Sequence, residues 1–181
     1  LWCGYHTYVR LAMFRFKHFT IEDAHTAMKI GTDGVLLGAW ADISSDSHIL
    51  DMGTGTGLIA IMSAQRNPEA RIVAVDIVED AVKEAQENVA NTMWSNRIDV
   101  VCSDVKLFDC GDKFDHIVSN PPFFTEAMQS PNEARRTARH ATTLTYEDII
   151  TVAERLLCPG GRLSVVLPTE CTMMFRKVAF E

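Results

Sequence analysis

The residues best suited to chemistry begin with a glycine-rich turn that opens on an acid, Asp51-Met52-Gly53-Thr54-Gly55-Thr56-Gly57. Glycine adopts positive φ and lets a ligand approach the backbone closely. Dinucleotide-binding turns read G-x-G-x-x-G, whereas here the third glycine comes one place earlier and Leu58 takes the dinucleotide position. The Asp51 carboxylate would repel a pyrophosphate but could receive an ammonium group. The turn therefore favours a cationic or zwitterionic nucleoside such as S-adenosylmethionine, with a plain strand-to-helix loop as the alternative.

Two more acids stand where later strands are expected to end. Asp76 closes the β-branched run 71–76, 19 residues after Gly57, and a carboxylate there can accept hydrogen bonds from ribose hydroxyls. Asp104 follows the run 98–102 and could accept a hydrogen bond from an adenine amino group. Without a ligand, Asp76 would be a surface acid and Asp104 a helix N-cap.

The most diagnostic stretch is Asn120-Pro121-Pro122-Phe123, which follows the apolar run 114–119. Prolines lack a backbone N–H and fix φ near about −65°, so nearby carbonyls are left without partners in a sheet ladder. The Asn120 amide oxygen and one such carbonyl could together hold a single amino group, while Phe123 could stack on a planar substrate. An ordinary turn at the end of a strand is the alternative.

Short apolar runs alternate with stretches of helical periodicity along the chain. The expected strands are 48–52, 71–76, 98–102, 114–119 and 162–167, and the expected helices are 58–65, 79–91 and 146–157. A turn is expected at 159–161, and a helix is expected to begin within 172–180. Strands separated by helices pair in parallel through right-handed crossovers, so the sequence predicts a doubly wound, mostly parallel α/β sheet. Ligands bind such sheets beyond the carboxyl ends of the strands, where the acids and Asn120 fall.

Composition narrows the class of protein. The 181 residues suit one domain, with 47% hydrophobic and 23% charged residues, as in soluble proteins. No apolar run approaches the length of a membrane span, and no signal peptide is evident. Five cysteines without a CxxC pair predict neither a disulfide framework nor a zinc ribbon, which suits a cytoplasmic location. Histidines without ligand spacing predict no metal.

The net charge of −7 means that a nucleic-acid partner would need a local basic patch. Two clusters qualify, one of them late in the chain and one near its start: Arg135, Arg136, Arg139 and His140; and Arg10, Arg15, Lys17 and His18. Solvated faces of ordinary segments are the alternative for both. Trp40 and Trp94 are expected to be packing residues rather than platforms for RNA.

Taken together, these motifs resemble the class I S-adenosylmethionine methyltransferases with an [Asn/Asp]-Pro-Pro-aromatic motif, which methylate amino nitrogens of adenine, guanine or glutamine. Segments 14–19 and 27–40 narrow the likeness to the tRNA1(Val) adenine-37 N6-methyltransferase family. The similarity continues through 139–144 and 165–168. The resemblance spans residues 14–181 and leaves 1–13 as a non-family extension. The family's fold has two further strands after the fifth, so this Rossmann-like sheet is expected to lack its last strands.

The resemblance implies roles for particular residues. The catalytic motif is Asn120, Pro121, Pro122 and Phe123, with Phe123 where relatives often have tyrosine. The implied cofactor-binding residues are Lys29, Thr32, Asp51, Gly53, Gly55, Gly57, Asp76, Ile77, Asp104 and Asn120. Arg135, Arg136, Arg139 and His140 would contact the tRNA substrate. Asp33-Gly34 is equally consistent with a simple turn. The protein is also expected to be a cytoplasmic monomer that binds neither a metal nor a membrane.

Four other functions remain open at this point. A methyltransferase of protein glutamine or of guanine N2 in rRNA would share Asn120–Phe123. A nicotinamide-dependent oxidoreductase is disfavoured by Asp51 and the glycine spacing. A non-catalytic, truncated copy that binds a ligand or a partner is the fourth.

Overall fold

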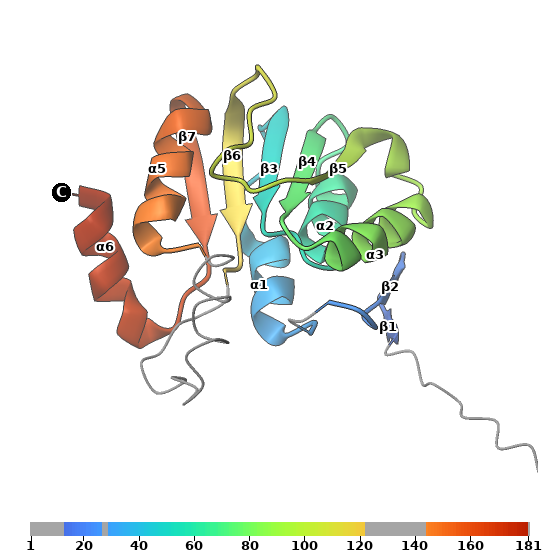
Figure 1. Ribbon diagram of the computed structural model, residues 1–181. Helices are drawn as coiled ribbons and strands as arrows, with labels where there is room; N and C mark the ends of the chain where they lie inside the picture. The colour runs from blue at the N-terminus through green and yellow to red at the C-terminus, as the bar shows by residue number, and fades with distance from the viewer. Residues whose placement is uncertain (1–12, 27–28, 122–143, 181) are drawn as a thin grey trace, which may run out of the picture.

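The computed structural model describes residues 13–26, 29–121 and 144–180. A five-stranded parallel sheet in the order β5-β4-β3-β6-β7 forms its centre (Figure 1). The strands are β3 (His48–Met52), β4 (Arg71–Asp76), β5 (Ile98–Cys102), β6 (Phe114–Ser119) and β7 (Leu157–Val165). The first four coincide with the expected runs, and the doubly wound parallel fold is confirmed.

Helices cover both faces of the sheet, which accounts for strands that are apolar on both sides. The helices are α1 (Thr32–Trp40), α2 (Leu58–Arg66), α3 (Glu79–Ala90), α5 (Tyr146–Leu156) and α6 (Thr172–Phe180). One buried cluster joins α1 and α2 to side chains such as Ile49 and Ile72. A second cluster, on other strand residues including Leu50 and Ile117, packs against α5. α5 begins with the expected capping box between Thr145 and Asp148.

The order of the strands fixes where a ligand can bind. From central β3 the chain moves outward to β4 and β5, then crosses back to β6 and β7 on the other side. The carboxyl ends of β3 and β6 therefore form the switch point at which doubly wound sheets bind ligands. Ser119 joins β6 to β3 at this point, because its Oγ donates a hydrogen bond to the Met52 carbonyl at 2.8 Å.

The N-terminal part adds elements that were not expected. β1 (Met13–Arg15) and β2 (Thr20–Glu22) form a small antiparallel hairpin. Asp33 and Gly34 lie in the first turn of α1, so the interpretation of these residues as a simple turn is wrong. Trp94 is half-buried and packs on Phe19 edge to face, as expected of a packing residue, with ring centroids 6.1 Å apart. Trp40 is 87% exposed, so the expectation that it is a packing residue is wrong.

The last strand also differs from expectation. Pro159, Gly160 and Gly161 were expected to form a turn before a strand at 162–167, yet they lie inside β7. β7 pairs Leu157 with Phe114 and then Arg162 with His116, so the register shifts between these pairs. Gly160 has a φ of 82°. The turn residues form an irregular bulge that the ladder accommodates, because glycine tolerates this backbone without a Cβ penalty.

Two negative observations hold for the residues described. No helix among them is long and apolar enough to cross a membrane. No group of three or more acidic, histidine or cysteine side chains among them could hold a metal ion.

Candidate active site

The glycine-rich turn opens onto free space at the carboxyl end of β3. Gly53, Gly55 and Gly57 have φ values of 75°, 56° and 82°, which only glycine adopts without strain. A Cβ added at Gly53 or Gly55 would meet no atom within 4 Å, whereas one at Gly57 would contact Ala85 on α3. The first two glycines therefore leave room for a ligand against the backbone, and the third lets α3 pack closely.

Asp51 lies fully buried at the start of this turn. Its Oδ2 accepts hydrogen bonds from the Thr54 hydroxyl at 2.6 Å and from the Ala60 amide at 3.0 Å. Its Oδ1 is buried and has no hydrogen-bond partner in the part of the chain that the structure describes. Burial raises the pKa of Asp51 to about 7. An orphaned acceptor of this kind fits the ammonium group of an amino-acid ligand.

Asp76, at the end of β4, lies next to the same turn. Its Oδ2 accepts a hydrogen bond from the Gly55 amide at 2.9 Å, and its Oδ1 accepts one from the Val78 amide at 2.9 Å. The carboxylate thus orders the glycine turn, and each oxygen keeps a lone pair for a ribose hydroxyl. Ile77, next along the chain, is 39% exposed and stands beside this carboxylate in the sequence.

Asp104 follows β5 and belongs to a tight turn rather than to a helix. Its Oδ1 accepts a hydrogen bond from the Lys106 amide at 3.0 Å, and its backbone oxygen accepts from the Leu107 and Phe108 amides. Arg155 on α5 donates to three carbonyls of this turn, those of Val105, Lys106 and Phe108. These contacts hold the turn in place. The Asp104 carboxylate caps this turn, but no helix follows it in the described residues before β6, so the alternative that made Asp104 a helix N-cap is wrong.

Asn120 follows β6, directly across the switch point from the glycine turn. Its Oδ1 is buried and has no hydrogen-bond partner among the residues described. Its Nδ2 lies 3.5 Å from the place that a Cβ on Gly34 of α1 would occupy, so α1 packs against the amide. Pro121 is buried. Pro122, Phe123, Arg135, Arg136, Arg139 and His140 lie outside the described residues.

The segment that leads into α1 is fastened from behind by α3. Buried Glu84 accepts hydrogen bonds from the amides of Ala24, His25 and Thr26. Burial alone would raise its pKa, but these amides outweigh burial and hold the pKa of Glu84 below its ordinary value. Local sequence patterns did not predict this set of hydrogen bonds, although a glutamate on the apolar face of an amphipathic helix was a signal for it.

Lys29 and Thr32 were expected to bind the cofactor. The Lys29 ammonium forms an ion pair with buried Asp23 at 3.1 Å and donates to the carbonyls of Asp23 and Ala24. Thr32 is the exposed first residue of α1. Both residues lie on the segment that reaches Asn120, but the observed contacts give Lys29 a structural role.

The residues present fit S-adenosylmethionine. Asp51 offers the ammonium an acceptor that has no partner in the described part of the chain, the open glycines leave room for the amino-acid part of the cofactor, and Asp76 can hold the ribose. Asn120 supplies a second unpartnered acceptor at the same edge of the sheet. Two orphaned oxygens at the switch point are consistent with a site that holds one ligand and one substrate.

Comparison with known proteins agrees with this arrangement. The methyltransferase small domain family matches residues 24–176. A tRNA1(Val) (adenine(37)-N6)-methyltransferase of Bacteroides fragilis is 45% identical over 169 residues, which cover 92% of this chain and 71% of that protein. The protein of the same name from Phocaeicola vulgatus is 51% identical over 157 residues, which cover 87% of this chain and 67% of the relative.

Solved structures give the same fold. TrmN from Thermus thermophilus superposes with a TM-score of 0.59 at 25% identity, over 80% of this chain and 40% of that one. A predicted O-methyltransferase from Agrobacterium tumefaciens reaches a TM-score of 0.64 at 21% identity, over 82% of this chain and 67% of that one. The chain belongs to the S-adenosylmethionine-dependent methyltransferase small domain family, among the tRNA1(Val) (adenine(37)-N6)-methyltransferases.

Proposed function

We propose that this protein methylates N6 of adenine 37 in tRNA1(Val), using S-adenosylmethionine. The observation that carries the proposal is the buried Oδ1 of Asn120, which has no hydrogen-bond partner among the described residues and stands across the switch point from the likewise unpartnered Oδ1 of Asp51. The relatives named for this activity resemble the chain over about nine-tenths of its length, 92% in one case. Two acceptors at this place, Asn120 Oδ1 and the Pro121 carbonyl, would suit a substrate amino group better than a hydroxyl, because an amino group has two hydrogens to donate.

The bound cofactor supplies a methyl group on a positively charged sulfur, which makes the methyl carbon electrophilic. Asp51 would hold the ammonium end, Asp76 would hold the ribose hydroxyls, Asp104 would accept from the adenine amino group of the cofactor, and Ile77 would contact the adenine ring. Lys29, which pairs with Asp23, and Thr32, the first residue of α1, would border this site. Asp76 and Arg155 already order the two turns that carry these residues.

The substrate amino group needs orientation more than a strong base. Asn120 Oδ1 and the Pro121 carbonyl accept the two hydrogens of N6, which draws the nitrogen lone pair out of conjugation with the ring. The freed lone pair would then point at the methyl group, which the bound cofactor would supply as the electrophile, and the cofactor sulfur would take up the electrons of the C–S bond. The alkylated nitrogen then releases a proton to water. Positioning and electrostatics therefore supply most of the rate.

The target adenine must leave its stack to reach this site. Phe123 stacks on the extruded base, a contact worth about 1–3 kcal/mol by analogy with single-strand binding. Pro122 keeps the motif rigid, and Arg135, Arg136, Arg139 and His140 contact phosphates of the tRNA. We also infer that the protein acts in the cytoplasm as a monomer.

The test supplies labelled S-adenosylmethionine with unmodified total tRNA and, separately, with rRNA and with cell protein. Nucleosides from the RNA are then identified by mass spectrometry. We expect the label as N6-methyladenosine in tRNA, and mapping of the fragment identifies the position. Label in methylguanosine of rRNA or in protein glutamine would contradict the proposal, as would cofactor binding without any transfer.

A further inference from the structure

The β1–β2 hairpin presents three basic side chains to solvent. Arg15, Lys17 and His18 are all exposed, and together they define what we call the basic hairpin face. Residues 13–22 contain a single acid, Glu22 at the end of β2. In a chain whose net charge is −7, such a local concentration of positive charge is unusual and suits an anionic partner.

Most other described cations are already engaged. Lys29, Lys83 and Lys106 pair with neighbouring acids, and Arg162 pairs with Asp42 and Asp46. The remaining engaged side chains donate to backbone carbonyls: Arg66, Arg97, Lys113 and Arg155. The side chains of Arg15, Lys17 and His18 form no ion pair or hydrogen bond with any residue that the structure describes. Unpaired neighbours of like charge repel one another, so the free protein gains nothing from gathering them.

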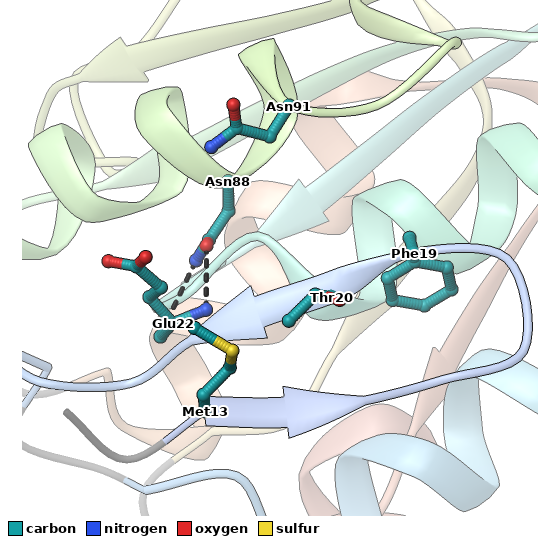
Figure 2. A pocket seen from close by; sticks show the side chains of 6 residues that line it. All are labelled: Met13, Phe19, Thr20, Glu22, Asn88 and Asn91. Carbon is teal, nitrogen blue, oxygen red and sulfur yellow. Dashed lines mark hydrogen bonds between the residues drawn. The ribbon is translucent and has the colours of Figure 1, made fainter. Parts of the chain in front are cut away.

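The hairpin is a rigid platform. Phe16 and Phe19 stack across its turn with ring centroids 4.6 Å apart, and Phe19 is buried against Trp94. On β2, the Glu22 amide donates to Asn88 Oδ1 at 2.8 Å, and Asn88 Nδ2 donates back to the Glu22 carbonyl at 2.9 Å (Figure 2). A partner that binds this hairpin therefore pays little to order it.

The hairpin also lies at the same edge of the sheet as the active site. Asn88 Nδ2 donates a second hydrogen bond, at 2.9 Å, to the Thr56 carbonyl in the glycine-rich turn. One side chain thus joins β2 to the cofactor loop. In Figure 1 the hairpin lies below α3, at the end of the sheet to which the strand arrows point. A large substrate held at Asn120 can extend across this edge.

The hollow between the hairpin and α3 is not suited to bind an anionic partner. It measures about 360 Å³ and is lined by Met13, Phe19, Thr20, Glu22, Asn88 and Asn91 (Figure 2). The Asn88 amide is already occupied on both of its polar atoms, and the Glu22 carboxylate would repel a phosphate. The available positive charge lies on the neighbouring residues of the hairpin.

We infer that the basic hairpin face contacts the phosphate backbone of the RNA substrate, at a place on the RNA away from the methylated base. The inference rests on the proposed tRNA substrate. It assigns to Arg15 and Lys17 charge contacts that carry no sequence information and that raise affinity and orient the RNA on the enzyme. RNA is favoured over an anionic membrane because the face shares its edge of the molecule with a site suited to a nucleobase.

The test compares three exposed cations by exchanging each for glutamine. Arg15→Gln and Lys17→Gln remove charge from the hairpin, and Arg71→Gln removes the same charge at the start of β4, on the opposite edge of the sheet. Binding of unmodified tRNA is measured at several salt concentrations. Each hairpin variant is expected to bind tRNA about three- to tenfold more weakly, with a salt slope about 0.7–0.9 smaller. Arg71→Gln is expected to match the unmodified protein.

Steady-state kinetics with tRNA shows whether the hairpin cations bind the substrate or only support the fold. In the hairpin variants KM for tRNA should rise, while kcat, cofactor affinity and thermal stability stay unchanged. Variants that bind tRNA as Arg71→Gln does would overturn the inference. So would hairpin variants that lose binding to phosphatidylglycerol vesicles while keeping full tRNA affinity. If the unmodified protein methylates no tRNA, the proposed function itself fails. Normal methylation with insensitive hairpin variants refutes the hairpin inference alone.

Discussion

Two buried polar clusters lie toward opposite ends of the same sheet, and they differ in how completely their hydrogen bonds are made. The first, which we call the amino-end cluster, begins at Asp46, just before the amino end of β3, where His116 Nδ1 contacts Asp46 Oδ2 at 2.8 Å, and from there His116 Nε2 contacts Ser164 Oγ, further along β7, at 2.8 Å. Arg162 donates to the other Asp46 oxygen at 2.6 Å. At the carboxyl ends, Asp51 and Asn120 each keep a buried oxygen without a partner among the described residues.

The comparison shows that satisfaction of hydrogen bonds is more informative than the identity of the residues. The amino-end cluster has the serine–histidine–aspartate connectivity of a hydrolase triad. However, His116 is only 1% exposed, and its bonds join the loop before β3 to strands β6 and β7. Buried polar groups in proteins are normally paired, so a complete network points to structure and an incomplete one to a missing ligand.

The largest effect is expected from Asn120→Ala. This change removes the acceptor that orients the substrate amino group, so kcat should fall by about 100- to 1000-fold. The cofactor dissociation constant should stay within about threefold, because Asp51 and Asp76 hold the cofactor. Single-turnover methylation of tRNA and calorimetric titration with S-adenosylmethionine check the two parts.

The matched control is Asn96→Ala, which removes an exposed asparagine from the short 3-10 helix Ser95–Arg97. It should leave both constants unchanged. Near-normal turnover in Asn120→Ala would remove the distinction between the two clusters, because an unpartnered amide would then have no catalytic consequence.

Asp46→Ala should act on stability and not on chemistry. It leaves His116 without its carboxylate and Arg162 without its main partner, which we expect to lower the free energy of unfolding by about 3 kcal/mol. Ser164→Ala removes one neutral hydrogen bond and should cost about 1 kcal/mol. Urea denaturation measures both. Kinetic constants of the folded variants should equal those of the unmodified protein, and a specific loss of methylation would assign a role in catalysis to the amino-end cluster.

Protonation of Asp51 is expected to control cofactor affinity. Its pKa is raised to about 7 by burial, and only the carboxylate attracts the ammonium group. Affinity should therefore rise about fivefold between pH 6 and pH 7, below the range where an α-amino group loses its proton. Titration of the protein with S-adenosylmethionine across this range gives the profile. Asp51→Asn should bind the cofactor weakly at every pH, without this slope.

The same shift has a consequence for the stability of the free protein. Because the folded state binds the Asp51 proton more tightly than the unfolded chain does, the free energy of unfolding should decline as the pH rises from about 4 to about 7. Asp51→Asn removes this contribution. An Asp51→Asn profile that still follows the unmodified protein would assign the pH dependence to another group.

The sequence predicted the parts of this comparison that depend on local pattern. Strands 71–76, 98–102 and 114–119 were located because strands covered by helices on both faces are continuous apolar runs. The positions of Asp51 and Asn120 then followed from topology, because parallel strands bring their carboxyl ends to one edge. What topology could not supply was the orphaned state of their oxygens, which depends on side-chain partners.

The remaining differences come from contacts across the fold. β1 and β2 have three residues each, too few for a periodic pattern to identify. Pro159 and the glycines after it mark a turn in most sequences, and only pairing with β6 keeps them in a strand. Glu84 finds its partners about 60 residues away in the chain. No local rule indicates such a pairing, although the burial of a charged side chain requires one.

The smallest effects are expected from substitution of two glycines on α1, Gly38, which faces the core, and Gly34, which faces Asn120. A Cβ at Gly38 would lie 2.6 Å from Met62 Sδ and 3.1 Å from Met62 Cβ, so Gly38→Ala should lower the free energy of unfolding by about 1 kcal/mol. A Cβ at Gly34 would lie 3.5 Å from Asn120 Nδ2, an ordinary contact, so Gly34→Ala should fold normally. Its added methyl group restricts the catalytic amide, and we expect kcat to fall about threefold with stability unchanged or slightly raised. Urea denaturation and tRNA methylation of both variants test the pair. Equal effects on both measurements would mean that α1 meets the active site and the core in the same way.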